Sequence, residues 1–362
     1  MKTANIDALT GLRGLAAWMV VLYHFREFLT GHPGDAARMP IDGGYLAVDL
    51  FFILSGLVLY INYHHQFERL QPAAALGFYF RRIARIYPLH FVVLCLFLLN
   101  PLAIALFSSA GNLGDRYEPV YFLLSVFLVQ NWGFTPSVEW NIPAWSISTE
   151  FAAYLLFPLL VVGLKRVARR GAWWPLLVYG GLVVATAVLF AWRGLPSIGE
   201  DISRMGVMRC LLEFSMGLVL GYYQIRDPKQ LSRLSGACMA VLLLAVVGLS
   251  LAGGLADYLV APLLFTLLIV GLLDARLPWS RMFAARPLLY LGEISYSTYM
   301  IHYFVKDWVK FLSRDVGPVQ WLVYLLAVFA LSVLLYRWVE QPFRTRAYHW
   351  LSRAFGGTRV AQ

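Results

Sequence analysis

Long apolar stretches recur along the whole chain and alternate with shorter polar segments. Eleven such runs lie near 9–29, 44–63, 86–108, 117–130, 145–164, 173–191, 205–224, 236–252, 258–273, 287–311 and 318–337. A helix that crosses a bilayer needs about 20 predominantly apolar residues, and most of these runs approach that length. The pattern therefore predicts an all-α, polytopic membrane protein with short connections.

The run at 117–130 departs from this pattern. It holds about 14 residues and leads into a polar, tryptophan-rich stretch at 130–145. A segment of this length is more typical of a re-entrant or interfacial position than of a crossing. We therefore predict about ten transmembrane helices plus one re-entrant or outer-surface segment, while a crossing at 117–130 stays an open alternative.

The charges of the connecting segments support this topology. With a cytoplasmic N-terminus, the predicted inner segments hold 21 of the 30 Lys and Arg residues and 6 of the 20 Asp and Glu residues, which leaves 9 and 14 outside. An excess of Lys and Arg on the cytoplasmic side is the usual orientation signal. Both termini are then cytoplasmic, and the net charge of +10 reflects orientation in a bacterial inner membrane rather than a nucleic-acid partner.

The composition excludes a soluble enzyme and a disulfide scaffold. The chain is 60% hydrophobic and 14% charged, whereas a soluble domain is roughly 25% charged. Cys95, Cys210 and Cys238 lie in apolar runs without disulfide or metal-ligand spacing, so we expect buried thiols and no metal site. We predict one domain over 1–362, with a membrane core at 9–343 and a cytoplasmic tail at 344–362.

Two ionisable residues fall inside the first apolar run. A charge at membrane depth costs about 2.5–3.5 kcal/mol or more, so such a residue is a functional candidate. Arg13 and His24 are separated by three helical turns plus roughly 20°, which puts them on one face about 16 Å apart. Arg13 is predicted near the inner mouth and His24 in the outer half. The structural alternatives are an arginine that snorkels to inner phosphates and an interfacial histidine. Because Arg13 interrupts the run and no small-residue cleavage site follows, a retained helix is favoured over a signal peptide.

Four further charged residues complete this picture. Arg82 and Arg85 lie three apart at the predicted cytoplasmic entrance, where two guanidinium groups suit phosphate oxygens. The alternative for them is a positive-inside anchor. Asp49 lies at about the predicted depth of His24, where it would orient the imidazole or pair with an arginine. Glu150 also falls in the predicted outer half.

Polar side chains on two later runs suggest a surface that binds a substrate. Ser146 shares a helical face with Glu150, and Trp145 precedes it. Tyr299 and His302 continue a polar stripe in a run that otherwise should be apolar. Another pair, Arg209 and Glu213, lies four residues apart and is expected to be structural.

Six short motifs occur in order along the chain. They are Gly11-Leu12-Arg13-Gly14-Leu15-Ala16-Ala17 with Tyr23-His24, Asp49-Leu50-Phe51-Phe52-Ile53-Leu54-Ser55-Gly56, Arg81-Arg82-Ile83-Ala84-Arg85-Ile86-Tyr87-Pro88, Trp145-Ser146-Ile147-Ser148-Thr149-Glu150, Ile294-Ser295-Tyr296-Ser297-Thr298-Tyr299 with His302, and Glu340-Gln341-Pro342-Phe343. In this order the chain resembles the acyltransferase-3 family of integral membrane acyltransferases, as a stand-alone member without the periplasmic esterase-like domain of larger members.

The resemblance implies ten membrane helices and transfer of an acyl group, usually acetyl from cytoplasmic acetyl-CoA, to a hydroxyl of an extracytoplasmic glycan. The family's arginine–histidine pattern falls on Arg13 and His24, and its paired arginines fall on Arg82 and Arg85. Acetyl-CoA is then a cosubstrate, and no permanently bound cofactor is expected. The expected partners are acyl-CoA, a glycan or glycoside acceptor and membrane lipid. The oligomeric state is not predicted.

A mechanism follows as a hypothesis. His24 is the general base, because a neutral imidazole suits proton transfer near pH 7. Glu150 or Asp49 would orient it, while the arginines would hold the CoA phosphates. The pantetheine arm, roughly 15–20 Å long, matches the three-turn spacing along the helix. An acyl-histidine intermediate is the alternative route.

Other functions remain open at this level. Buried charges and ten helices fit a secondary transporter equally well on physical grounds. If the chain is an acyltransferase, the acyl group could also be succinyl or a longer one. The acceptor could equally be a small molecule or a lipid-linked glycoside.

Overall fold

The computed structural model describes residues 4–26, 39–107, 116–252, 255–313 and 316–354. All regular structure in these ranges is helical, which confirms the all-α prediction. The last eight residues of the predicted tail, 355–362, lie outside the described residues, as do the ends of two predicted apolar runs at 27–29 and 108.

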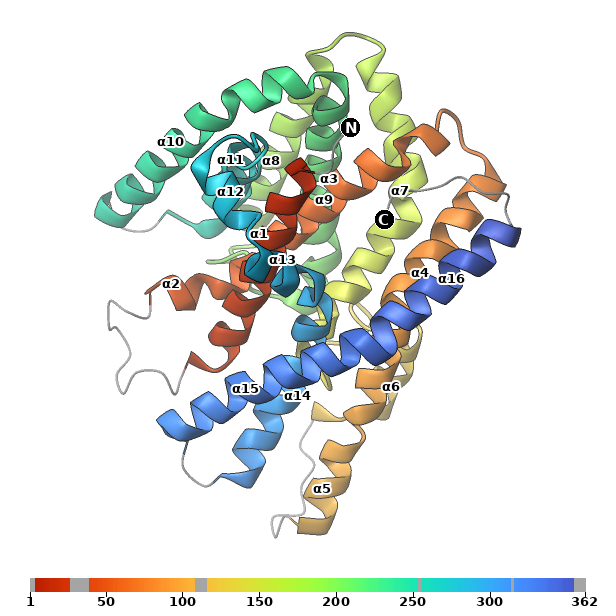
Figure 1. Ribbon diagram of the computed structural model, residues 1–362, viewed down its shortest axis with the longest axis vertical. Helices are drawn as coiled ribbons and strands as arrows, with labels where there is room; N and C mark the ends of the chain where they lie inside the picture. Colours follow the sequence, from red (N-terminus) through yellow and green to blue (C-terminus); the bar gives the residue numbers. More distant parts are fainter. Residues whose placement is uncertain (1–3, 27–38, 108–115, 253–254, 314–315, 355–362) are drawn as a thin grey trace.

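The described chain forms a succession of helices and short helical turns (Figure 1). In order, they are α1 (Ala4–His24), α2 (Met39–Asp42), η3 (Gly43–Leu46), α3 (Ala47–Tyr63), η4 (His64–Gln66), α4 (Pro72–Leu96), α5 (Leu99–Phe107), α6 (Pro119–Val126), η6 (Ile142–Ala144), α7 (Trp145–Ala168), α8 (Trp174–Trp192), α9 (Ile202–Arg226), α10 (Pro228–Ala252), α11 (Asp257–Gly271), α12 (Pro278–Phe283), α13 (Arg286–Glu293), α14 (Ser295–Leu312), α15 (Pro318–Leu335), η7 (Tyr336–Glu340) and α16 (Gln341–Ala354). Figure 1 shows α15 and α16 as one long rod, joined by the π-helical turn η7.

Seven helical stretches among the described residues are long and apolar enough to cross a membrane. They are Gly43–Gln66, Pro72–Phe107, Ile142–Ala168, Trp174–Trp192, Ile202–Arg226, Pro228–Leu249 and Pro318–Ala347. Each coincides with a predicted crossing, so the chain is an integral membrane protein. The other three predicted crossings fall on α1, on the 15-residue helix α11 and on α13–α14. The total of ten and the cytoplasmic termini therefore stay predictions.

The short run at 117–130 does not form a spanning helix. Its helix α6 has eight residues and is about 12 Å long, well short of the hydrocarbon thickness of about 30 Å. From Phe127 the chain continues through turns and bends to η6. This agrees with a re-entrant or surface segment rather than a crossing.

The run at 287–311 was expected to be one helix, and this is wrong. Helix α13 ends at Glu293 and α14 begins at Ser295, with Ile294 between them at a ψ of 0°. At the break, α13 touches the backbone of α1, since a Cβ added to Gly292 would lie 2.0 Å from the Thr10 carbonyl oxygen. The close packing of α13 on α1 thus lets α14 take its own direction, and α14 carries the polar stripe.

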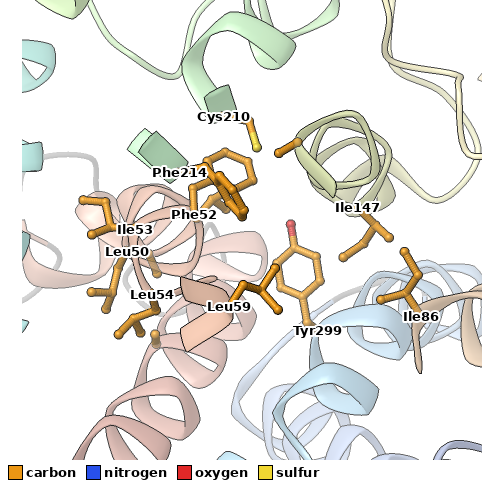
Figure 2. Close-up of a cluster of buried hydrophobic side chains, with 14 of the residues drawn as sticks. Leu50, Phe52, Ile53, Leu54, Leu59, Ile86, Ile147, Cys210, Phe214 and Tyr299 are labelled. Carbon is orange, nitrogen blue, oxygen red and sulfur yellow. The ribbon is translucent and has the colours of Figure 1, made fainter. Parts of the chain in front are cut away.

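The core is built on close contact between α3 and α9. A Cβ added to Gly56 would lie 2.0 Å from the Phe214 carbonyl oxygen, and one added to Gly217 would lie 2.0 Å from the Ile53 carbonyl oxygen. Figure 2 shows the buried side chains around this contact, including Phe52 of α3 beside Phe214 of α9. Two glycines on facing helices therefore set the distance between α3 and α9.

This contact gives a prediction for stability. Gly217→Ala should lower the melting temperature of the detergent-purified protein, because overpacking a tight contact typically costs about 1–3 kcal/mol. Gly180→Ala on α8 is the matched control, since no atom lies within 4 Å of a Cβ at that position. There, alanine should be neutral or stabilising because it favours helix. Equal melting temperatures for the two variants would contradict the glycine contact.

Candidate functional site

Helix α1 positions two of the predicted site residues, and glycines fix where it lies. A Cβ at Gly11 would lie 1.9 Å from the Phe283 carbonyl oxygen, and one at Gly14 would lie 2.6 Å from the Gly292 amide nitrogen. Helix α1 also packs on α14 and α3. Its rotation and depth are therefore set by backbone contacts, and Arg13 and His24 face other protein elements.

The three predicted arginines come together beside the middle of this helix. We call Arg13, Arg82 and Arg85 the arginine cluster. The charge of Arg85 acts on Arg13, so these two side chains are electrostatic neighbours. The Arg82 guanidinium lies 5.0 Å from the ring centroid of Tyr154, and Tyr154 also interacts with Arg13. The structure thus brings together three cations from α1 and α4, as the sequence suggested.

Glu150 belongs to this end of the site. Its Oε1 accepts hydrogen bonds from the Ser55 hydroxyl and, at 2.6 Å, from the Tyr154 hydroxyl. Its charge acts on Arg13. The expectation that Glu150 orients His24 is therefore wrong. Because α7 begins at Trp145, residue 150 already lies about 7 Å along the helix, among the arginines.

Glu340 is a site residue that the sequence reasoning missed. It lies on η7, is 3% exposed, and accepts a hydrogen bond of 2.9 Å from the Ser297 hydroxyl. The charges of Arg85 and Arg13 both act on it. An acidic residue at the end of an apolar run was the available signal. Two carboxyl groups therefore lie among the three guanidinium groups of the arginine cluster.

At the C-terminal end of α1, His24 lies beside His302. We call these two residues the histidine pair. The Nδ1 atom of His24 lies 3.0 Å from the Val20 carbonyl oxygen and 3.2 Å from Nε2 of His302. The Nδ1 atom of His302 lies 2.6 Å from the Tyr299 carbonyl oxygen. His302 is 0% exposed. The sequence named both histidines but did not predict that they touch.

Aromatic and basic side chains surround the histidine pair. The Tyr303 ring meets His24 edge-on, with centroids 5.3 Å apart. The Lys306 ammonium lies 4.3 Å from the centroid of the Tyr303 ring. Tyr23 also meets His24 edge-on, at 5.1 Å. The imidazole of His24 is thus held by three rings and one backbone carbonyl.

Asp49 does not reach His24, so the expectation that it orients this ring is also wrong. Its Oδ1 and Oδ2 accept hydrogen bonds from Nε and a terminal nitrogen of Arg209, at 2.5 and 2.6 Å. The open alternative, a pairing with an arginine, is confirmed. The expected Arg209–Glu213 pair is replaced by this contact, because tight packing of α3 on α9 brings Asp49 directly opposite Arg209. Glu213 lies buried within electrostatic range of both.

The remaining predicted residues join the helices to one another. The hydroxyl groups of Ser146 and Tyr299 lie 2.8 Å apart, and the Tyr299 hydroxyl donates to the Pro143 carbonyl oxygen at 2.9 Å. The Trp145 ring lies 5.4 Å from the Arg209 guanidinium. These side chains are about 95% buried. Their role in binding an acceptor stays a prediction, and in the structure they join α7 to α14 and to α9.

The site therefore has two chemically different ends on one helix. The arginine cluster can hold an anionic ligand through charge-assisted hydrogen bonds. The histidine pair can take up and return a proton. Helical geometry separates Arg13 from His24 by about 16 Å along α1.

Comparison with known proteins gives a consistent result. The family model of an acyltransferase domain, Acyl_transf_3, matches residues 6–337. The acyltransferase MdmB of Streptomyces mycarofaciens is 30% identical over 84% of this chain and 80% of its own length. The O-acetyltransferase OatA of Staphylococcus aureus strain NCTC 8325 is 22% identical over 95% of this chain. A putative O-acetyltransferase of strain COL is 23% identical over 96% of this chain.

The coverage of these relatives is uneven. The chain spans 58% of the length of OatA and 59% of the strain COL protein. No solved structure matches the chain. The similarity therefore concerns only part of those two longer proteins.

Proposed function

The chain belongs to the acyltransferase family whose model spans residues 6–337, and from this premise we propose that it carries an acyl group from cytoplasmic acyl-CoA to a hydroxyl acceptor. We take acetyl as the acyl group and an extracytoplasmic glycan or glycoside, at a bacterial inner membrane, as the acceptor. The names of two relatives as O-acetyltransferases support the acetyl group and an oxygen acceptor. The single observation that carries the proposal is the two-ended site on α1.

The arginine cluster is the proposed donor end. Coenzyme A carries phosphate groups, and arginine binds phosphate oxygens through its planar fork of donors. Glu150 and Glu340 lie within electrostatic range of Arg13, and Glu340 also lies within range of Arg85. A bound phosphate would compete with these carboxylates for the same guanidinium groups. The pantetheine arm would then extend from this end towards His24.

The histidine pair is the proposed chemical end. The acceptor oxygen attacks the thioester carbonyl carbon as Nε2 of His24 takes the hydroxyl proton. The carbon–sulfur bond then breaks, the ester is complete, and the CoA thiolate leaves. The proton held on Nε2 returns to that sulfur, so His24 ends the cycle neutral. No step in this route requires a metal or a redox partner.

The donor end is tested by changing Arg85. Arg85→Ala should raise the dissociation constant for CoA by about 10–100-fold, because a charged hydrogen bond contributes about 1.5–3 kcal/mol. The measurement is isothermal titration of the detergent-purified protein with CoA. Arg81→Ala is the matched control, since Arg81 lies on the same helix but donates to Gln66.

Two outcomes would count against this proposal. Unchanged CoA affinity in Arg85→Ala would remove the donor site from the arginine cluster. A wild-type protein that leaves the thioester of acetyl-CoA intact, with a panel of glycosides present, would remove the acetyl transfer itself and favour a transport function.

A further inference from the structure

We infer that His302 is a positioning residue, which holds His24 as the Nδ1–H tautomer and so leaves Nε2 as the basic nitrogen. The inference rests on the proposed function, because it assigns a task to the neighbour of the proposed base. It differs from the expectation for His302, which was contact with a substrate. The orientation of His24, which was expected of the carboxylate of Glu150 or Asp49, is thus assigned to the imidazole of His302.

Both ring nitrogens of His302 are already in use. Its Nδ1 lies 2.6 Å from the Tyr299 carbonyl oxygen, and its Nε2 lies 3.2 Å from Nδ1 of His24. The side chain is 0% exposed. An imidazole has two nitrogens for hydrogen bonding. His302 therefore has no ring nitrogen left for an acceptor hydroxyl.

The partners decide which nitrogens carry protons. A carbonyl oxygen only accepts, so Nδ1 of His302 must be its donor to Tyr299, and a neutral His302 then has its lone pair on Nε2. The Nδ1 atom of His24 faces this lone pair and the Val20 carbonyl oxygen at 3.0 Å. With two acceptors in front of it, Nδ1 of His24 must carry the proton. The lone pair of neutral His24 therefore lies on Nε2.

This arrangement strengthens as the reaction proceeds. When Nε2 of His24 takes the hydroxyl proton, the ring becomes positive and its Nδ1–H donates a charge-assisted hydrogen bond, which is about twice as strong as a neutral one. A neutral imidazole can accept that bond without adding a second buried charge, whereas a lone buried carboxylate would be costly to keep there. The hydrogen bond to His302 therefore stabilises His24 most when its ring is protonated, which is during proton transfer.

The surroundings of His302 hold it in this orientation. Helix α14 packs on α1 and α15. The Tyr299 side chain, one turn before His302, is fixed by Ser146 and the Pro143 carbonyl oxygen. The Asn141 side chain also donates to the Met300 carbonyl oxygen at 3.1 Å. Hydrogen bonds thus hold the Tyr299 side chain and the Met300 backbone just before His302, and this rigidity suits a residue that sets the angle of another ring.

The test separates kcat from KM in three variants of the full-length purified protein. The assay measures thiol release from acetyl-CoA and labelled acetyl transfer to the octyl glucoside used as acceptor. His302→Ala should lower kcat on the order of 10²-fold, with both KM values unchanged within twofold. His302→Gln should keep at least a tenth of the wild-type kcat, because its amide oxygen can accept from Nδ1 of His24. His90→Gln, at a buried histidine bound to Ser125, should leave kcat unchanged.

Each outcome decides the question. A raised KM for octyl glucoside with normal kcat in His302→Ala would return His302 to acceptor binding and overturn the inference. So would a normal kcat, or a folded His302→Gln as inactive as His302→Ala. If His302→Ala does not fold, the kcat of His302→Gln relative to His90→Gln decides. If only the inference on His302 is wrong, His24→Ala is still inactive and the wild-type protein still transfers acetyl. If His24→Ala transfers acetyl, or the wild-type protein does not, the proposed function itself is wrong.

Discussion

Replacing His24 with alanine is expected to lower kcat for acetyl transfer by about 10²–10⁴-fold, the usual contribution of a positioned general base. The affinity for CoA should stay within about twofold of wild type, because His24 lies about 16 Å from Arg13 along the helix and is not part of the arginine cluster. The measurement combines single-turnover transfer from labelled acetyl-CoA with isothermal titration of CoA. If the site has two separate ends, the variant should lose acetyl transfer but still bind CoA.

The control for His24→Ala is His65→Ala, at an exposed histidine on η4. It should leave both kcat and CoA affinity unchanged. If His24→Ala transfers acetyl at the wild-type rate, His24 is not the base. If CoA affinity falls along with kcat, the two ends of the site are not separate. Labelled protein trapped from wild type in the absence of acceptor, but not from His24→Ala, would identify the acyl-histidine route instead of direct transfer.

The parts of the site that lie on one helix were predictable. Apolar run length predicted the seven helical stretches that are long and apolar enough to cross a membrane, and the helical repeat placed Arg13 and His24 on one face of α1. The placement of Arg82 and Arg85 on one side of α4 also follows from their spacing within one helix. Periodicity is a local property, so it survives whatever the neighbouring helices do.

The contacts between helices were not predictable in the same way. Depth was estimated from distance to the end of an apolar run, and this assigned Asp49 and Glu150 to His24. The true partners depend on how far one helix slides along another. Gly56 and Gly217 set that register for α3 and α9, and it brings Asp49 to Arg209. The break at Ile294 likewise frees α14 to bring His302 to His24, which a single unbroken run would not suggest.

The buried pair of Asp49 and Arg209 gives the largest expected loss of stability. The side chains are 0% and 2% exposed, and the contact has two hydrogen bonds. Asp49→Ala should destabilise the fold by about 3–5 kcal/mol, because it removes the hydrogen-bonded counter-charge of a buried guanidinium. The measurement is the melting temperature of the purified protein in one detergent, with wild type alongside. An unchanged melting temperature would show that the pair adds nothing to the fold.

The double variant Asp49→Leu with Arg209→Met separates stability from catalysis. Replacing both partners of a buried ion pair by apolar side chains is often neutral or stabilising, so most of the melting temperature lost in Asp49→Ala should return. Because Asp49 bonds to Arg209 and not to His24, acetyl transfer should return as well. A double variant that is as stable as wild type yet inactive would mean that Asp49 acts in the reaction itself. That result would restore the role that was predicted for Asp49 from the sequence, and it would weaken the case for His302 as the side chain that positions His24.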